Sequence, residues 1–193
     1  MELVLTLFSL ACILSYTLAV CIKFKGVPNS ISASFYALEH KWWFRFTMWL
    51  TPMLLLPAIL ELSKPNTEFL AFLALVGMIV VGCFPDYTSN KFNYRGHVAG
   101  AVMSMVFSQV WIALNYPIAL AAWAVYLVLT MYFTFRNLDK LLDFYEEETF
   151  EDFVESFLKT KPLFWVETTC IGVIFYSLFV LLQRLLILGC NYV

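Results

Sequence analysis

Three side chains that could take part in chemistry surround a short polar stretch between two apolar runs. Asp86 follows Gly82-Cys83-Phe84-Pro85, and Arg95 and His97 come directly before the next apolar run. A chain reversal here would bring a carboxylate, a guanidinium and an imidazole together. Because histidine titrates near neutral pH, the trio predicts a site for a headgroup, a proton or a metal. The structural alternative is an Asp86–Arg95 ion pair, with His97 near a helix N-terminus.

Three further ionisable residues are candidates for the same site. Glu39 and His40 precede the second apolar run, and Glu167 lies about one turn into the last one. An ionisable group inside an apolar run is costly and is by default a functional hypothesis. The candidate polar site therefore consists of Asp86, Arg95, His97, Glu39, His40 and Glu167. The sequence assigns no catalytic residue, no metal ligand and no cofactor.

The composition places these residues among membrane helices. Hydrophobic residues make up 62% of the chain and charged residues 13%, against about a quarter charged in soluble domains. A soluble chain of 193 residues could not bury this much apolar surface in one core. We therefore expect an all-α, polytopic bundle in one domain, residues 1–193, with Pro52 and Pro57 bending the second helix. About six spans are expected, at residues 3–22, 43–60, 69–84, 98–114, 117–135 and 163–188.

Lysine and arginine are distributed unevenly between the expected spans. The first, third and fifth connections carry ten cations, the second carries only Lys64, and the fourth carries none. By the positive-inside rule, the odd connections are cytoplasmic and both termini lie outside. The first span has no positive residue before it and is interpreted as an uncleaved anchor. On the outer side, Arg184 is expected to pair with Glu61 or Glu68.

Small residues recur at every fourth position of the fourth span. This pattern lets helix backbones approach closely and predicts a central packing helix or, alternatively, a seam for self-association into a homo-oligomer. Gln109 adds an amide within the span and is expected to bond another helix's backbone. The predicted packing residues are Gly96, Gly100, Ser104 and Ser108.

An acidic segment at residues 137–161 precedes the last span. Its apolar residues keep helical spacing, which predicts a continuation of the fifth span, a break near residues 146–148 and an amphipathic cytoplasmic helix. Thr149 and Asp152 resemble a capping box, and Pro162 is expected to start the last span. The segment is either an interfacial helix with a solvated acidic face or a docking face for a basic cytoplasmic protein.

Several short motifs occur in a suggestive order. Val27-Pro28-Asn29-Ser30-Ile31-Ser32 precedes Trp43-Phe44 at the second span, and Val81-Gly82-Cys83-Phe84-Pro85-Asp86 is followed by His97 and Ala101. Over residues 25–115 the chain resembles small six-span bacterial membrane proteins of unknown function related to the Frag/DRAM/Sfk group. The resemblance implies a helical bundle and a role connected with lipids or membrane organisation, but no reaction. The acidic segment is not a feature of that group.

Three functions are therefore compared. The first is a non-catalytic protein that binds membrane lipids or a partner and organises them. The second is an oligomeric channel or small carrier, although no internal repeat is visible. The third is an intramembrane metal-dependent lipid hydrolase using Ser32, Asp86 and His97, although zinc usually takes three protein ligands. No basic block indicates nucleic acid, and the expected location is the bacterial inner membrane.

Overall fold

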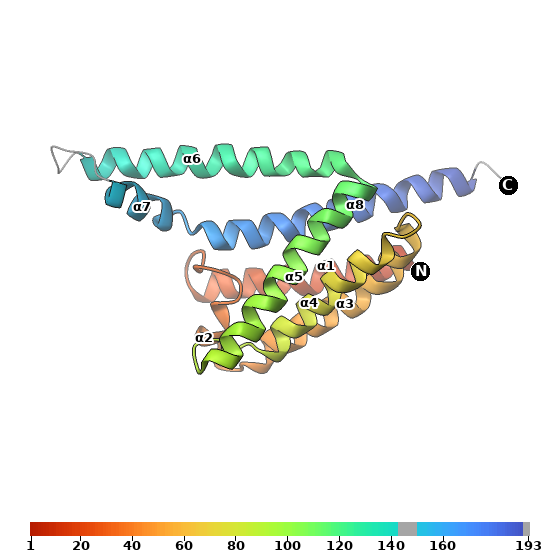
Figure 1. Cartoon of the computed structure of the whole chain (residues 1–193), viewed down its shortest axis with the longest axis horizontal. Coiled ribbons are helices and arrows are strands. Elements are labelled where there is room, and N and C mark those ends of the chain that lie inside the picture. Colours follow the sequence, from red (N-terminus) through yellow and green to blue (C-terminus); the bar gives the residue numbers. More distant parts are fainter. Residues whose placement is uncertain (143–149, 191–193) are drawn as a thin grey trace.

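The computed structural model describes residues 1–142 and 150–190, which form helices and no strand (Figure 1). The all-α prediction is confirmed. Five of these helices are long and apolar enough to cross a membrane: α1, α3, α5, α8, and α6 with the short helix before it. The elements are α1 (Glu2–Lys23), α2 (Ser34–Ala37), α3 (Trp42–Leu62), α4 (Glu68–Cys83), α5 (Lys91–Asn115), the 3₁₀ helix η1 (Pro117–Leu120), α6 (Ala121–Leu142), α7 (Phe150–Lys159) and α8 (Pro162–Cys190).

α4 has the predicted length, whereas α5 is longer than predicted. α4 has 16 residues, so it is about 24 Å long, less than the roughly 30 Å of a hydrocarbon core. α5 begins at Lys91, seven residues before the expected start, because Asn90 caps it: its Oδ1 accepts the N–H of Asn93 at 2.8 Å. Arg95 and His97 consequently lie inside a helix and do not open it. α8 begins at Pro162, as predicted.

The second predicted span is a single helix through both of its prolines. α3 continues across Pro52 and Pro57, each of which removes one backbone donor. The hydroxyl of Ser9 on α1 donates to the carbonyl oxygen of Thr51 at 2.9 Å, next to Pro52. This contact fixes α1 against α3 at the middle of both helices.

The helices form a compact group with one helix set apart. α1, α3, α4 and α5 pack together, α8 runs across them, and α6 lies along the other side of α8 (Figure 1). The fully buried side chains Ile13, Phe44, Trp111 and Leu178 mark the core between α1, α3, α5 and α8. α6 contacts α7, α8 and η1, so much of its surface is uncovered by the rest of the chain.

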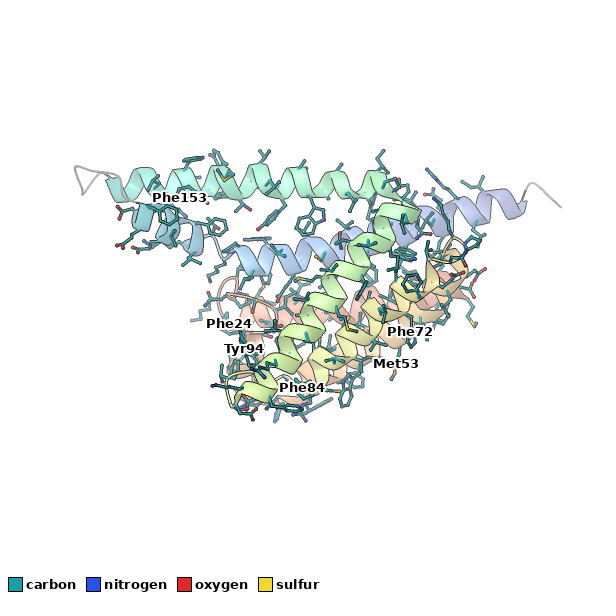
Figure 2. The ribbon with its side chains drawn as sticks, viewed as in Figure 1. Phe24, Met53, Phe72, Phe84, Tyr94 and Phe153 are labelled. Atoms are coloured by element: carbon teal, nitrogen blue, oxygen red, sulfur yellow. The ribbon has the colours of Figure 1, made fainter. Side chains whose placement is uncertain are left out.

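Apolar side chains also cover the outside of the molecule. Met53 on α3 is 63% exposed and Phe72 on α4 is 52% exposed, and both point away from the helix group (Figure 2). Val128 on α6 is 68% exposed. A water-soluble domain of this size does not present apolar rows on several helices, so the surface fits a hydrocarbon environment.

The helix connections gather at two opposite ends. At one end the ammonium of Lys161 donates to the carbonyl oxygen of Val27, which joins the fifth connection to the first. At the other end the backbone N–H of Lys64 donates to Oδ1 of the buried Asn115 at 2.7 Å. Each of the helices α1, α3, α4, α5, α6 and α8 therefore runs opposite to the one before it in this series (Figure 1).

The predicted partners of Arg184 and Gln109 are wrong. The guanidinium of Arg184 lies 5.3 Å from the ring centre of Tyr116, and among the described residues it forms no ion pair with Glu61 or Glu68. An aromatic face at the end of α5 takes the place of a carboxylate. Oε1 of Gln109 accepts the indole N–H of Trp123 on α6 at 3.0 Å, so its partner is a side chain.

α4 and α5 approach closely along the predicted small-residue stripe. A Cβ added at Gly100 would lie 2.9 Å from the carbonyl oxygen of Gly77 and 2.9 Å from the backbone nitrogen of Val81. At Gly77 it would lie 2.5 Å from the backbone nitrogen of Ser104. Gly96 packs against the ring of Phe84 in the same way. The stripe thus faces α4 inside the helix group, and Gly77 is its counterpart on the facing helix.

Candidate functional site

The third connection forms a compact turn around Asp86. The phenol of Tyr36, at the end of the first connection, donates to Oδ1 of Asp86 at 3.2 Å and accepts the N–H of Thr88 at 2.9 Å. The expected Asp86–Arg95 ion pair is not among the ion pairs of the described residues. Because α5 starts at Lys91, Arg95 lies on its exposed face.

His97 closes this turn from the other side. Its side chain is buried, and Nδ1 lies 2.8 Å from the carbonyl oxygen of Phe84. A carbonyl can only accept, so Nδ1 carries the proton. The ring lies 4.6 Å from that of Tyr87, which in turn meets Tyr36 edge to face at 5.2 Å. His97 therefore fixes the end of α4 to α5 through a backbone contact.

Glu167 holds the first connection against α8. Its Oε2 accepts the backbone N–H of Ile31, and Ser32 faces the same carboxylate. Glu167 and Ser32 also border a small cavity of about 100 Å³, together with Ser104 and Ser108 of α5. Burial raises the pKa of the Tyr87 phenol, whose ring contacts those of Tyr36 and His97.

Glu39 and His40 lie apart from this group. The carboxylate of Glu39 is exposed and pairs with the ammonium of Lys23 at 3.0 Å, and this bond lowers its pKa. His40 is exposed just before α3. Of the six predicted residues, Asp86 and His97 lie beside Tyr36 and Tyr87. Glu167 binds the first connection a few residues before Tyr36, whereas Arg95, Glu39 and His40 do not belong to this group. Tyr36 and Tyr87 were not predicted as site residues. The sequence signal for them is their position, Tyr36 directly after Ser34-Phe35 and Tyr87 directly after Asp86.

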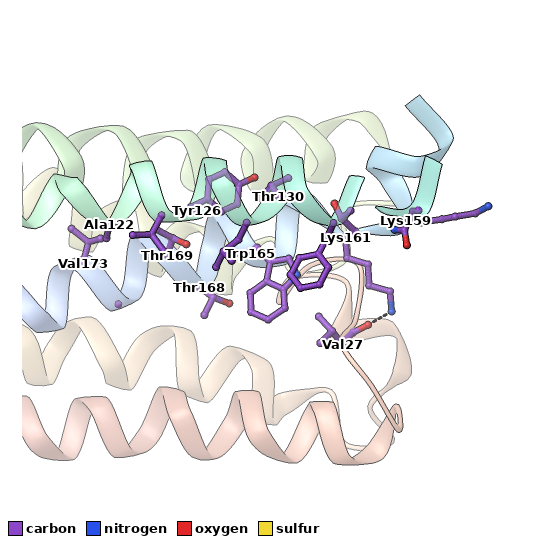
Figure 3. A pocket seen from close by; sticks show the side chains of 16 residues that line it. Val27, Ala122, Tyr126, Thr130, Lys159, Lys161, Trp165, Thr168, Thr169 and Val173 are labelled. Atoms are coloured by element: carbon purple, nitrogen blue, oxygen red, sulfur yellow. Dashed lines mark hydrogen bonds between the residues drawn. The ribbon is translucent and has the colours of Figure 1, made fainter. Parts of the chain in front are cut away.

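A larger cavity lies elsewhere, between α6 and α8. This α6–α8 groove has a volume of about 760 Å³ and opens to one side (Figure 3). Side chains of both helices line it, among them Tyr126 and Thr130 from α6 and Trp165 and Thr169 from α8 (Figure 3). The sequence analysis did not predict the groove. Its signal is a set of small and β-branched residues on facing helices: Ala122, Val125, Thr168, Thr169, Gly172 and Val173.

The groove is apolar along its length and polar at one end. Lys159, Thr160 and Lys161 border the end nearest α7, and Val27 of the first connection completes it (Figure 3). Lys161 donates to the carbonyl oxygen of Val27, while Lys159 pairs with Glu155 of α7 at 2.9 Å. Two cations of the fifth connection, Lys159 and Lys161, thus lie beside a channel of hydrocarbon character.

α7 is the second helical part of the acidic segment, whose first residues belong to the end of α6. It packs beside α6, and the rings of Phe153 and Phe135 lie 6.2 Å apart (Figure 2). Glu151 and Glu155 are exposed, so an acidic face is present. The predicted break at residues 146–148 and the cap at Thr149 lie outside the described residues. The docking of a basic protein on this face stays a prediction.

Comparison with family models, curated proteins and solved structures gives no match for this chain. Among the described residues, no group of three or more His, Cys, Asp and Glu side chains is placed to hold a metal ion. The fold itself defines the class: an all-helical bundle with five helices of membrane-spanning length, as in multi-pass membrane proteins. Within this class, the chain has two notable features. One is the turn formed by Tyr36, Asp86, Tyr87 and His97, called the aromatic turn below, and the other is the α6–α8 groove.

Replacing Glu167 by leucine is expected to release the first connection from α8. The backbone N–H of Ile31 would lose its acceptor, which costs about 1–3 kcal/mol for a buried group. Limited proteolysis should then cut within residues 24–33 faster than in the wild type. Glu167→Gln keeps an acceptor oxygen and serves as the matched control. Equal cleavage rates for Glu167→Leu and the wild type would contradict the anchoring role.

Proposed function

We propose that this chain is a non-catalytic integral membrane protein that binds a membrane lipid in the α6–α8 groove. The observation that carries the proposal is the groove itself: an apolar channel of about 760 Å³ between two membrane-length helices, with cationic residues at one end. Its volume lies within the roughly 300–1,000 Å³ of ligand sites in proteins. An acyl chain is the ligand that this combination of shape and lining suits best.

The surroundings of the groove support a lipid over a water-soluble ligand. Val125 and Leu129, which line it, are 59% and 50% exposed and continue into the apolar surface of α6. A ligand from the bilayer could therefore enter sideways between α6 and α8 without crossing water. Several of the polar side chains along the wall are threonines, and the hydroxyl of Thr168 already donates to its own helix, to the carbonyl oxygen of Phe164 at 2.8 Å.

The same proposal includes six crossings with both termini outside. α4 would be the sixth span, accommodated despite its length by local thinning of the bilayer. The contacts that join the first, third and fifth connections at one end support an even number of crossings. Ten of the twelve Lys and Arg residues belong to these connections, which favours the cytoplasm for this end. The bacterial inner membrane remains the proposed location.

Native mass spectrometry of protein released gently from its membrane tests the proposal. The expected result is one lipid that stays bound per chain after extended washing in detergent, in the wild type and equally in His97→Ala. The His97→Ala variant separates the groove from the aromatic turn, because His97 does not line the groove. Bare protein in both samples, at detergent concentrations that preserve the fold, would refute lipid binding.

A further inference from the structure

We infer that the lipid held in the α6–α8 groove is a glycerophospholipid, recognised through its phosphate by Lys161. This inference rests on the proposed function and names the chemical class of the ligand. The groove's cationic lining residues are Lys159 and Lys161, and both lie at the same end. A lipid chain lying along α6 and α8 would therefore present its headgroup to these two ammonium groups.

The ammonium group of Lys161 can still donate hydrogen bonds to a ligand. Its ammonium donates to the carbonyl oxygen of Val27, and an ammonium has three donors, so two are left for a phosphate oxygen. The residue directly precedes α8 and has a φ of 55°, a left-handed conformation that non-glycine residues seldom adopt. Its side chain extends to the carbonyl oxygen of Val27, which also borders the groove (Figure 3).

Lys159 is available through a weak and exchangeable pair. It bonds Glu155 four residues earlier on the same helix, with 48% and 61% of the two side chains exposed. Such exposed pairs are readily exchanged for another partner. The neighbouring Glu155 would be left beside the headgroup, where a carboxylate suits a headgroup that carries an ammonium as well as a phosphate. A strongly anionic headgroup would bind less tightly at this end of the groove, because the Glu155 carboxylate repels it.

Phosphate recognition is favoured over a neutral lipid by the position of the charges. A diacylglycerol would leave the Lys161 ammonium without an anionic partner at the mouth of an apolar channel, and Lys159 with Glu155 alone. A phosphate diester offers two anionic oxygens to them, and charge-assisted hydrogen bonds are about twice as strong as neutral ones. The expected preference for a phospholipid over a diacylglycerol with the same chains is about tenfold or more.

A binding series on the purified full chain in neutral detergent tests the inference. Phosphatidylethanolamine, phosphatidylglycerol, diacylglycerol and inorganic phosphate are added singly to delipidated protein, and bound species are counted by native mass spectrometry. The wild type is expected to take up both phospholipids, with phosphatidylethanolamine at least equal, about tenfold more tightly than diacylglycerol. In Lys161→Gln this preference should fall to about twofold, and Lys159→Gln should lower it less.

Lys64→Gln is the matched control. Its ammonium also donates to a backbone carbonyl, that of Leu114 at 2.6 Å, but at the opposite end of the molecule. An unchanged preference in this variant supports the assignment, and an equal loss in both would overturn it. Equal binding of diacylglycerol and phospholipid by the wild type would overturn the phosphate contact but leave lipid binding intact. Binding of inorganic phosphate as tight as that of phospholipid would overturn the lipid assignment, and no uptake of any lipid would refute the proposed function.

Discussion

Gly77→Leu is expected to unfold most of the protein or to prevent α4 from packing against α5. Even a Cβ at this position would lie 2.5 Å from the backbone nitrogen of Ser104 and 2.7 Å from the carbonyl oxygen of Gly100. Both atoms belong to the backbone of α5 and cannot rotate away, so the helices would have to separate. Overpacking of this kind costs about 3 kcal/mol or more, a large share of a typical stability of about 5–15 kcal/mol. Thermal unfolding in detergent, followed by circular dichroism, measures the loss.

Gly172→Ala is the control for the same measurement. A Cβ at Gly172 on α8 meets nothing within 4 Å, and alanine favours a helix by roughly 1 kcal/mol over glycine. This variant should therefore melt at or above the wild-type temperature. If Gly77→Leu melted at the wild-type temperature too, the close approach of α4 and α5 would be wrong.

Gly172→Trp is expected to remove the lipid without removing the fold. The open space at Gly172 is part of the α6–α8 groove, so an indole placed there would fill the channel that the acyl chain needs. Lipid retained after detergent washing should fall at least about tenfold, since the loss of several buried methylenes costs about 0.8 kcal/mol each. The melting temperature should stay close to that of Gly172→Ala at equal lipid content.

Ala11→Trp provides the comparison on a lipid-facing surface. Ala11 is exposed on α1 and does not line the groove, so the variant adds the same indole without filling the channel. It should retain lipid like the wild type. Full retention by Gly172→Trp as well would place the bound lipid outside the groove.

The fold followed from local signals where these were strong. Runs of apolar residues predicted the helices, and the starts of α3 and α8 fell within one residue of the expected positions. The start of α5 was misplaced because its first turn is polar and hydropathy does not detect a polar turn. The capping residue Asn90 marks this start. Pairing between distant helices, such as Arg184 with Tyr116, depends on rotation about helix axes that hydropathy leaves open.

The candidate site was predictable only in part. Charge in an apolar context pointed to His97 and Glu167, and both prove to bind backbone groups of other segments. The α6–α8 groove had no such marker, because a cavity reflects side chains that fail to fill the space between two helices. Its small residues, such as Gly172, are ordinary in membrane helices. That α6 and α8 lie side by side and enclose a groove is seen only in the three-dimensional structure.

Photo-crosslinking with a phospholipid that carries a diazirine on one acyl chain tests the central claim most directly. Delipidated protein in detergent receives one equivalent of the probe, and the adducts are mapped by peptide mass spectrometry. Lipid binding in the groove predicts adducts concentrated on its lining, at Leu129, Trp165 and Val173, and their loss in Gly172→Trp. Adducts spread equally over exposed apolar residues outside it, such as Phe8 of α1 and Phe72 of α4, would contradict it.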